Sequence, residues 1–280
     1  VQRQPDTRIH CVLSDGTAAV MVYDRLENVI CWIKITSAGA TGLIEDICVL
    51  PGDDGDEEDH VYYTIQRTVN SATVRYHEKQ AFESVCIGGT LNYQADSYIT
   101  FTNSPASATV TGLTHLVGAS VVVWADGKCL DDANGDIATF TVNGSGEITL
   151  TDGGSSYSAT TGVVGLSYTA QWKSSKLLLV AQDVANRHLA KAEKNIRGLG
   201  LLLADAHLKG LKFGPDFTHL DDMPSREGWA AVAADTVHTD YDESVIVFPG
   251  VWAVDTRLCL QAQAPRPVKV LAAIMEIGLE

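Results

Sequence analysis

The chain has 280 residues, of which 45% are hydrophobic, and its 35 acidic and 20 basic side chains give a formal net charge of −15. This length supplies a core for one large or two medium domains, and the 24 glycines favour a β-rich fold with many tight turns. The acidic balance excludes a protein that holds nucleic acid through its phosphates, because such binding depends on Lys and Arg. No segment approaches the roughly 20 apolar residues of a membrane-spanning helix.

Runs of apolar residues separated by turn signals predict antiparallel strands in the first 80 residues. Asp15-Gly16 lies between two alternating runs, and glycine tolerates the positive φ that such hairpin turns need. Asn70-Ser71 lies in a second predicted hairpin. The expected strands occupy Arg8–Tyr23 (two strands), Asn28–Ile35, Gly42–Leu50, Val61–Gln66 and Ala72–Glu78.

Short strands at close spacing predict a small barrel or sandwich between Leu113 and Trp172. Val121–Trp124 runs into the turn Asp126-Gly127, and Thr139–Val142 with Ile148–Leu150 is expected to form a hairpin around the turn NGSG. The neighbouring stretches are rich in Ser, Thr, Gly and Asp and are interpreted as connectors. They are Gln94–Ser107 and Thr151–Thr161.

Strands are expected again after Lys173, in KLLLV, LGLLLAD, VIVFPG, RLCLQAQ and PVKVLAAIMEI. Only Asp183–Lys194 offers a helical pattern, with an acidic start and a basic end that suit the helix dipole. Pro265 and Pro267 would interrupt a central strand, so the APRP stretch is expected at an edge or in a loop.

Two acidic segments are candidate Ca²⁺ sites. The first is the loop Pro51–His60, whose carboxylates lie in Asp53–Asp59 (DDGDEED), and this pattern lacks the spaced ligands and the glycine of an EF-hand. The second contains Asp132, Asn134 and Asp136, but Ile137 stands where an EF-hand needs glycine. We therefore expect no metal site, and we expect the first loop to be exposed or poorly ordered because its six carboxylates repel one another.

Two His/Asp groups invite a hydrolase interpretation, and a glycine pair invites a nucleotide-binding one. Neither GxSxG nor HExxH accompanies the histidines, and Gly198-Leu199-Gly200 lacks the third glycine of a dinucleotide loop. We therefore predict a protein that is not an enzyme, with no catalytic residues and no cofactor. The two groups are His219 with Asp221 and Asp222, and His238 with Asp240 and Asp242.

The cysteines and tryptophans are expected to be structural. No CxxC or Cys/His metal spacing occurs, so buried, reduced thiols of a protein made in a cytoplasm are expected. Scattered single tryptophans are typical of core or interface anchors. The cysteines are Cys11, Cys31, Cys48, Cys86, Cys129 and Cys259, and the tryptophans are Trp32, Trp124, Trp172, Trp229 and Trp252.

Several sequence segments, collinear over most of the chain, resemble segments of the tail nozzle proteins of short-tailed bacteriophages, also called tail tubular protein B. The segment Arg8–Gly52 is similar in its DGT turn, its Tyr-Asp, its V-x-x-W strand and its closing Pro-Gly. The others are DHVYYTIQRTVNSATVRYHEK (Asp59–Lys79), GLTHLVGASVVVWADGK (Gly112–Lys128), GEITL (Gly146–Leu150), VGLSYTAQ (Val164–Gln171) and the final Val247–Gly278. Members of that family are longer at the front, so this chain, which starts at Val1, is expected to be part of a longer protein.

The resemblance implies a virion structural protein of the phage tail, assembled in the host cytoplasm. Its subunits would form a ring, expected to be a homohexamer, which docks under the tail adaptor and portal, closes the tail and conducts DNA during ejection. Genomic DNA would pass without sequence-specific binding, and tail fibres are further candidate partners. The alternative is a host-receptor or carbohydrate-binding tail module.

The sequence predicts a mainly β chain, in which an antiparallel framework domain carries an inserted small β-barrel and little helix. The framework is expected at 1–88 and 173–280, and the barrel with its connectors at 89–172. Strands of Arg8–Glu78 should then pair with strands of Val245–Ile277 in one shared core, while Val121–Leu166 packs mostly with itself. On this scheme, a deletion of Gly112–Trp172 leaves a folded protein.

Overall fold

A computed structural model describes residues 1–26, 28–39, 41–177, 193–224, 226–227, 230–231, 236–242 and 245–279. The predicted mainly β fold with little helix is confirmed: the described strands pair antiparallel, and the described helices are single 3₁₀ turns. The chain divides into two compact units. Unit 1 comprises Val1–Cys86 and Thr90–Tyr168, and unit 2 comprises Ile87–Gly89 and Thr169–Glu280.

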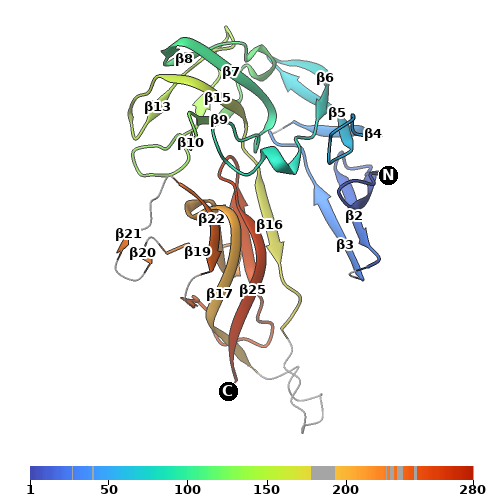
Figure 1. The fold of residues 1–280 in the computed structure, drawn as a ribbon, viewed down its shortest axis with the longest axis vertical. Helices are drawn as coiled ribbons and strands as arrows, with labels where there is room; N and C mark the ends of the chain where they lie inside the picture. The colour runs from blue at the N-terminus through green and yellow to red at the C-terminus, as the bar shows by residue number, and fades with distance from the viewer. Residues whose placement is uncertain are drawn as a thin grey trace. The chain divides into compact units, whose positions relative to one another are not determined.

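Unit 1 contains the first fifteen strands and two 3₁₀ turns (Figure 1). They are β1 (Thr7–Val12), β2 (Ala18–Asp24), β3 (Val29–Ile35), β4 (Leu43–Leu50), β5 (His60–Val69), β6 (Ala72–Lys79), η1 (Glu83–Val85), β7 (Asp96–Ser107), β8 (Thr109–Val110), η2 (Thr114–Leu116), β9 (Ser120–Ala125), β10 (Lys128–Cys129), β11 (Phe140–Thr141), β12 (Ile148–Thr149), β13 (Thr151–Asp152), β14 (Ser155–Ser156) and β15 (Ala159–Leu166).

The first six strands form two three-stranded meanders, β1-β2-β3 and β4-β5-β6. Their turns follow the predicted signals: Asn70 and Ser71 have φ +49° and +65°, as a two-residue hairpin turn requires, and Gly16 has φ +77° in the longer loop between β1 and β2. A shared core of Ala18, Ile44, Val61, Tyr63 and Ile65 holds the two sheets together.

The rest of unit 1 is a small β module with one apolar core. Strands β10, β9, β15 and β7 are neighbours in that order, β11 pairs with β9, and β12 pairs with β8. Trp124, Leu113, Leu130 and Leu150 are among its largest fully buried side chains. Only Ala38 among the buried residues of this core comes from before Phe101. Strand β15 pairs with β7 as well as with β9, so Val121–Leu166 does not pack with itself alone.

A buried arginine joins the meanders to this module. Arg67 on β5 donates from Nε and Nη2 to the two Glu78 carboxylate oxygens at 2.9 and 3.0 Å, and from Nη1 to the Ala38 carbonyl. Its Nη2 also lies 3.5 Å from Asp96 Oδ2 at the start of β7. The Arg67 side chain is only 4% exposed, so this buried guanidinium links the meanders to the start of β7 through hydrogen bonds and ion pairs.

Unit 2 contains two four-stranded sheets around its own core. Strands β16, β24, β18 and β19 form one sheet, and in the other the long β17 pairs with β25 on one edge and with β22 and β23 on the other (Figure 1). Leu199, Leu201, Leu211 and Phe213 are buried in this core. The strands and the 3₁₀ turn are β16 (Thr169–Lys173), β17 (Lys194–His207), η3 (Leu208–Gly210), β18 (Leu211–Asp216), β19 (His219–Asp222), β20 (Arg226–Glu227), β21 (Ala230–Ala231), β22 (Val237–Asp242), β23 (Ile246–Val247), β24 (Cys259–Gln263) and β25 (Lys269–Leu279).

The expected pairing of Arg8–Glu78 with Val245–Ile277 is wrong for the described residues. Strands β1 to β6 find all their partners among themselves, and β23 to β25 pair with β16, β17 and β18. Sequence neighbours complete the first sheets because tight hairpins are the shortest connection available. The segments 1–88 and 89–172 thus belong largely to one unit, and β16, expected in the barrel, pairs with β24 of unit 2.

Three local predictions need correction or lie outside the description. Asp96–Ser107, expected to be a connector, is the twelve-residue strand β7. Phe140–Thr141 and Ile148–Thr149 form strands, but they pair with β9 and β8 rather than with each other. The helical pattern at Asp183–Lys194 lies outside the described residues except at its end, where Lys194 begins β17. Among the described residues, no helix is long and apolar enough to cross a membrane.

Candidate functional site

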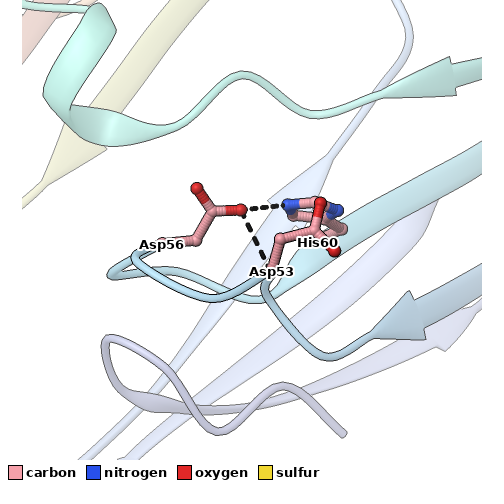
Figure 2. Close-up of side chains that lie close together, drawn as sticks. All are labelled: Asp53, Asp56 and His60. Carbon is pink, nitrogen blue, oxygen red and sulfur yellow. Dashed lines mark hydrogen bonds and ion pairs between the residues drawn. The ribbon is translucent and has the colours of Figure 1, made fainter.

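The acidic loop between β4 and β5 brings three metal-ligating side chains together (Figure 2). One donor atom each from Asp53, Asp56 and His60 lies within 4.8 Å of the others. Asp56 Oδ2 accepts a hydrogen bond from His60 Nε2 at 2.8 Å and one from the Asp53 backbone N–H at 3.1 Å. Hydrogen bonding to His60 lowers the pKa of the Asp56 carboxyl below its usual value of 3.8.

Further hydrogen bonds hold the loop against its neighbours. Asp59 Oδ2 accepts the backbone N–H groups of Arg3 and Gln4 at 2.6 and 3.2 Å, and Glu58 Oε1 accepts that of Glu83 at 2.7 Å. The expectation of exposure is confirmed for Asp53, Asp54 and Glu57, whereas Asp56, Glu58 and Asp59 are half-buried and His60 is buried. Repulsion between the carboxylates is therefore offset by N–H donors that the sequence pattern did not reveal.

Two carboxylates and an imidazole suit a transition metal such as Zn²⁺ better than Ca²⁺, which prefers oxygen ligands. The same geometry is already accounted for by the hydrogen bonds that Asp56 accepts from the His60 ring and from the Asp53 backbone N–H. The sequence analysis considered only the carboxylates of this loop. It missed His60, because the i, i+3, i+7 spacing brings side chains together on a helix, and this segment is a loop in which sequence spacing does not predict proximity.

We expect the loop to depend on His60 and not on a metal. His60→Ala removes a mostly buried hydrogen bond to a carboxylate and a ring contact with Phe82 at 5.3 Å, so it should lower the free energy of unfolding by about 1–3 kcal/mol. EDTA should leave the thermal unfolding temperature of the wild type unchanged, and the exposed Asp54→Asn is the matched control. A fall in that temperature with EDTA, or a rise with Zn²⁺, would instead reveal a bound metal.

The other candidate residues lie apart or form turns. Asp132 Oδ1 accepts the backbone N–H groups of Asn134 and Asp136 at 2.8 and 3.0 Å, and the hydrogen bond from Asn134 lowers the pKa of Asp132. This is a carboxylate that closes a turn.

The predicted His/Asp groups are not assembled as expected. His219 Nδ1 lies 3.0 Å from Asp216 rather than beside Asp221 or Asp222, and its side chain is 75% exposed. Asp222 pairs with Lys212 at 2.9 Å. His238 lies on β22 opposite Ala206. The Gly198–Gly200 pair lies within β17, where a side chain at Gly198 would collide with Val245.

The six cysteines form no disulfide in the described part of the chain, as expected, but not all are buried. Cys129 and Cys259 are buried, whereas Cys31 and Cys48 are exposed, which corrects the expectation for those two. Among the tryptophans, Trp124 is fully buried and Trp32 is 61% exposed. Trp229 lies outside the described residues.

A cavity of about 400 Å³ lies within unit 1, between the meanders and the segment that leads into β7. Its wall includes four tyrosines (Tyr63, Tyr93, Tyr98 and Tyr168) and the carboxylates of Glu78, Glu83 and Asp96. Burial raises the pKa of Tyr63 to about 12 and that of Cys86 to about 12. Both groups stay protonated near neutral pH, so they act here as neutral polar groups rather than as nucleophiles.

His10, which contacts Tyr63 of the cavity wall, should make unit 1 sensitive to mild acid. His10 lies 3.1 Å from Gln2 Oε1 and 3.4 Å from the Tyr63 hydroxyl, and burial, followed by nearby positive charge, lowers the pKa of His10 below 6.5. A histidine with a depressed pKa stabilises the fold above pH 6.5, and this contribution is lost as the pH falls toward the folded pKa. We expect thermal unfolding at pH 5.5 to occur a few °C lower than at pH 7.5, and His10→Gln to reduce that difference. An unchanged difference in the variant would contradict this assignment.

The outer face of the β1-β2-β3 sheet is an unusual surface. Opposed residues share a face, and the register places Ile9 opposite Met21 and Met21 opposite Trp32. The other residues of this face are Thr7, Tyr23, Ile30, Cys11, Ala19 and Lys34. An antiparallel sheet with one buried face normally presents polar side chains on the other, whereas this face has only Thr7, Tyr23 and Lys34 beside its apolar residues.

Strand β3 is also a free edge within its sheet, since its only described strand partner is β2. Ile30, Trp32 and Ile33 are 64%, 61% and 49% exposed. A long apolar edge strand is a template for association with another chain. We name this surface, the outer face together with the β3 edge, the β3 surface.

Unit 2 carries a second apolar surface. A groove of about 430 Å³ is lined by residues of β16, β18, β24 and β25 and by the turn before β25. Trp172, Val270 and Leu271 in its wall are 52%, 39% and 65% exposed, and none of its lining residues is charged.

Comparison with known proteins adds no relative: no protein-family model matches the chain, and no curated protein matches it.

Proposed function

We propose that this chain is a structural, non-enzymatic subunit of a bacteriophage tail nozzle. Its copies form a ring that closes the tail, docks on the tail adaptor and conducts DNA during ejection. The observation that carries the proposal is the β3 surface, which is apolar where a protein working as a monomer would be polar. The collinear sequence segments that resemble tail nozzle proteins indicate which assembly this subunit would join, a ring in the phage tail.

A ring of identical subunits needs heterologous contacts, in which two different surfaces of the chain meet. The β3 surface and the groove of unit 2 are two such surfaces on the described residues. A tail component also has to conduct DNA without retaining it. A net charge of −15 serves this role, because acidic walls do not neutralise phosphates.

The test is the assembly state of the intact protein. Native mass spectrometry and negative-stain electron microscopy at micromolar concentration should show a closed ring, with six subunits expected from the resemblance. In a gel-shift assay at 150 mM salt, the ring should not retain double-stranded DNA. A protein that stays monomeric at 100 µM, or a ring that binds DNA tightly, would contradict the proposal. Glycan-array binding by the monomer would point to a receptor-binding module instead.

A further inference from the structure

We propose that the β3 surface of one copy docks into the groove of unit 2 on a second copy. This inference rests on the proposed function and assigns the subunit contact to named residues. Its occupant is another copy of this chain, meeting head to tail.

The first half of the contact supplies an exposed apolar area centred on β3. Tyr23, Ile30 and Trp32 on the outer face are 40%, 64% and 61% exposed, and Val29 and Ile33 on the opposite face of β3 are 43% and 49% exposed. If a large apolar side chain offers about 150–250 Å², the exposed parts of the three outer-face residues amount to roughly 300 Å² and those of the other two to roughly 200 Å². A standard interface takes about 800 Å² from each partner. Half-buried Ile9, Cys11 and Met21 extend the outer face.

The second half of the contact is the groove of unit 2, which is mainly apolar, as the β3 surface is. Trp172 on β16 and Leu271 on β25 are exposed walls, with Leu211, Leu260 and Ala262 also lining the groove. An aromatic or aliphatic side chain that enters such a groove is the usual centre of an interface. Trp32 and Ile30, adjacent on the outer face, protrude from unit 1 without cover from that unit's core.

Charge explains why the occupant is a second copy. Two copies of a chain with net charge −15 repel one another unless their contact surfaces lack charge. The outer face carries one charged residue, Lys34, and Asp15 pairs with it at 3.2 Å. The groove has no charged lining residue. Both surfaces are thus poor in charged side chains as well as apolar.

The experiment uses two variants that each damage one half. Trp32→Glu and Leu271→Glu place a charge on an exposed position, so both should fold, as checked by circular dichroism. Leu50→Glu and Val247→Glu are matched controls, because both residues are exposed and apolar (48% and 83%) but lie outside the two surfaces. Assembly is measured by native mass spectrometry and analytical ultracentrifugation.

We expect each single variant to be monomeric and both controls to assemble as the wild type does. An equimolar mixture of Trp32→Glu and Leu271→Glu should form a dimer of twice the 30.0 kDa chain mass, because one intact β3 surface and one intact groove remain. The rate at which a maleimide labels Cys31 on β3, relative to Cys48, should fall on assembly of the wild type.

Three outcomes would overturn the inference. Trp32→Glu could assemble normally, Leu271→Glu could assemble normally, or the mixture could remain monomeric. A normal Leu271→Glu with a monomeric Trp32→Glu would mean that two β3 surfaces meet face to face. In each case a ring-forming wild type leaves the proposed function standing, whereas a monomeric wild type contradicts both proposals.

Discussion

Replacement of Arg67 with alanine should lower the free energy of unfolding by about 3–5 kcal/mol, a large part of the 5–15 kcal/mol that typically stabilises a domain. The guanidinium lies between Glu78 and Asp96, whose side chains are 14% and 27% exposed. Its removal leaves two partly buried carboxylates without their cation and the Ala38 carbonyl without a donor. Urea unfolding, followed by the fluorescence of Trp124, measures the loss.

Arg75 provides the matched control. It makes the same two-pronged contact with a carboxylate, to Glu45 at 2.6 and 3.0 Å, but its side chain is 59% exposed. Water and salt screen such pairs, so Arg75→Ala should cost less than about 1 kcal/mol. If both variants lost the same free energy of unfolding, burial would not be the reason why the Arg67 contact stabilises the fold.

Deletion of Gly112–Trp172, even with a short Gly/Ser bridge, should abolish the cooperative unfolding of unit 1. The deletion removes β9 and β15, so β7 loses its described strand partner, and most of the core that contains Phe101 and Val110 disappears. This reverses the outcome expected from the sequence. Scanning calorimetry and tryptic digestion should show that residues 1–111 are degraded within minutes. A cooperative unfolding transition in residues 1–111 of the deletion variant would contradict this prediction.

A smaller change in the same region is the control. The turn Asn143–Gly146 is closed by Asn143 Oδ1, which accepts the backbone N–H of Ser145 at 2.9 Å, and Asn143, Gly144 and Ser145 are exposed. Insertion of two serines after Gly144 should lower the unfolding temperature by only a few °C, because exposed loops tolerate insertion.

Turn chemistry was the most reliable sequence signal. The predicted turns Asp15-Gly16, Asn70-Ser71 and Asp126-Gly127 join paired strands, and positive φ occurs at Gly16 and at both residues of the other two turns. These signals are local, whereas strand pairing depends on tertiary packing. Strand β7 was missed because its Ser, Thr, Asn and Pro content is typical of a connector. Its partner β15 lies more than fifty residues further along the chain, so no local signal predicts their pairing.

The sites were less predictable than the strands. Arg67 lies in an ordinary alternating strand, and its ties to Ala38 and Asp96 span 29 residues each. The β3 surface did leave a signal: Val29–Ile33 is apolar at every position rather than at alternate ones. Such a run is typical of a strand covered on both faces. Sequence alone could not reveal that Val29–Ile33 is exposed on both faces in the structure.

The pairing of β17 has a consequence for how quickly amide hydrogens exchange with solvent. Both edges of this strand are occupied, by β25 along Lys194–Ala204 and by β22 and β23 on the other side. Its amides can exchange only when the sheet opens, so Leu201–Leu203 should be among the last in unit 2 to take up deuterium. By contrast, β3 is held on one edge, and alternate amides along it should exchange within seconds in a monomer. Deuterium uptake would therefore distinguish β17, both edges of which pair within its own chain, from β3, one edge of which is left for pairing with a second copy.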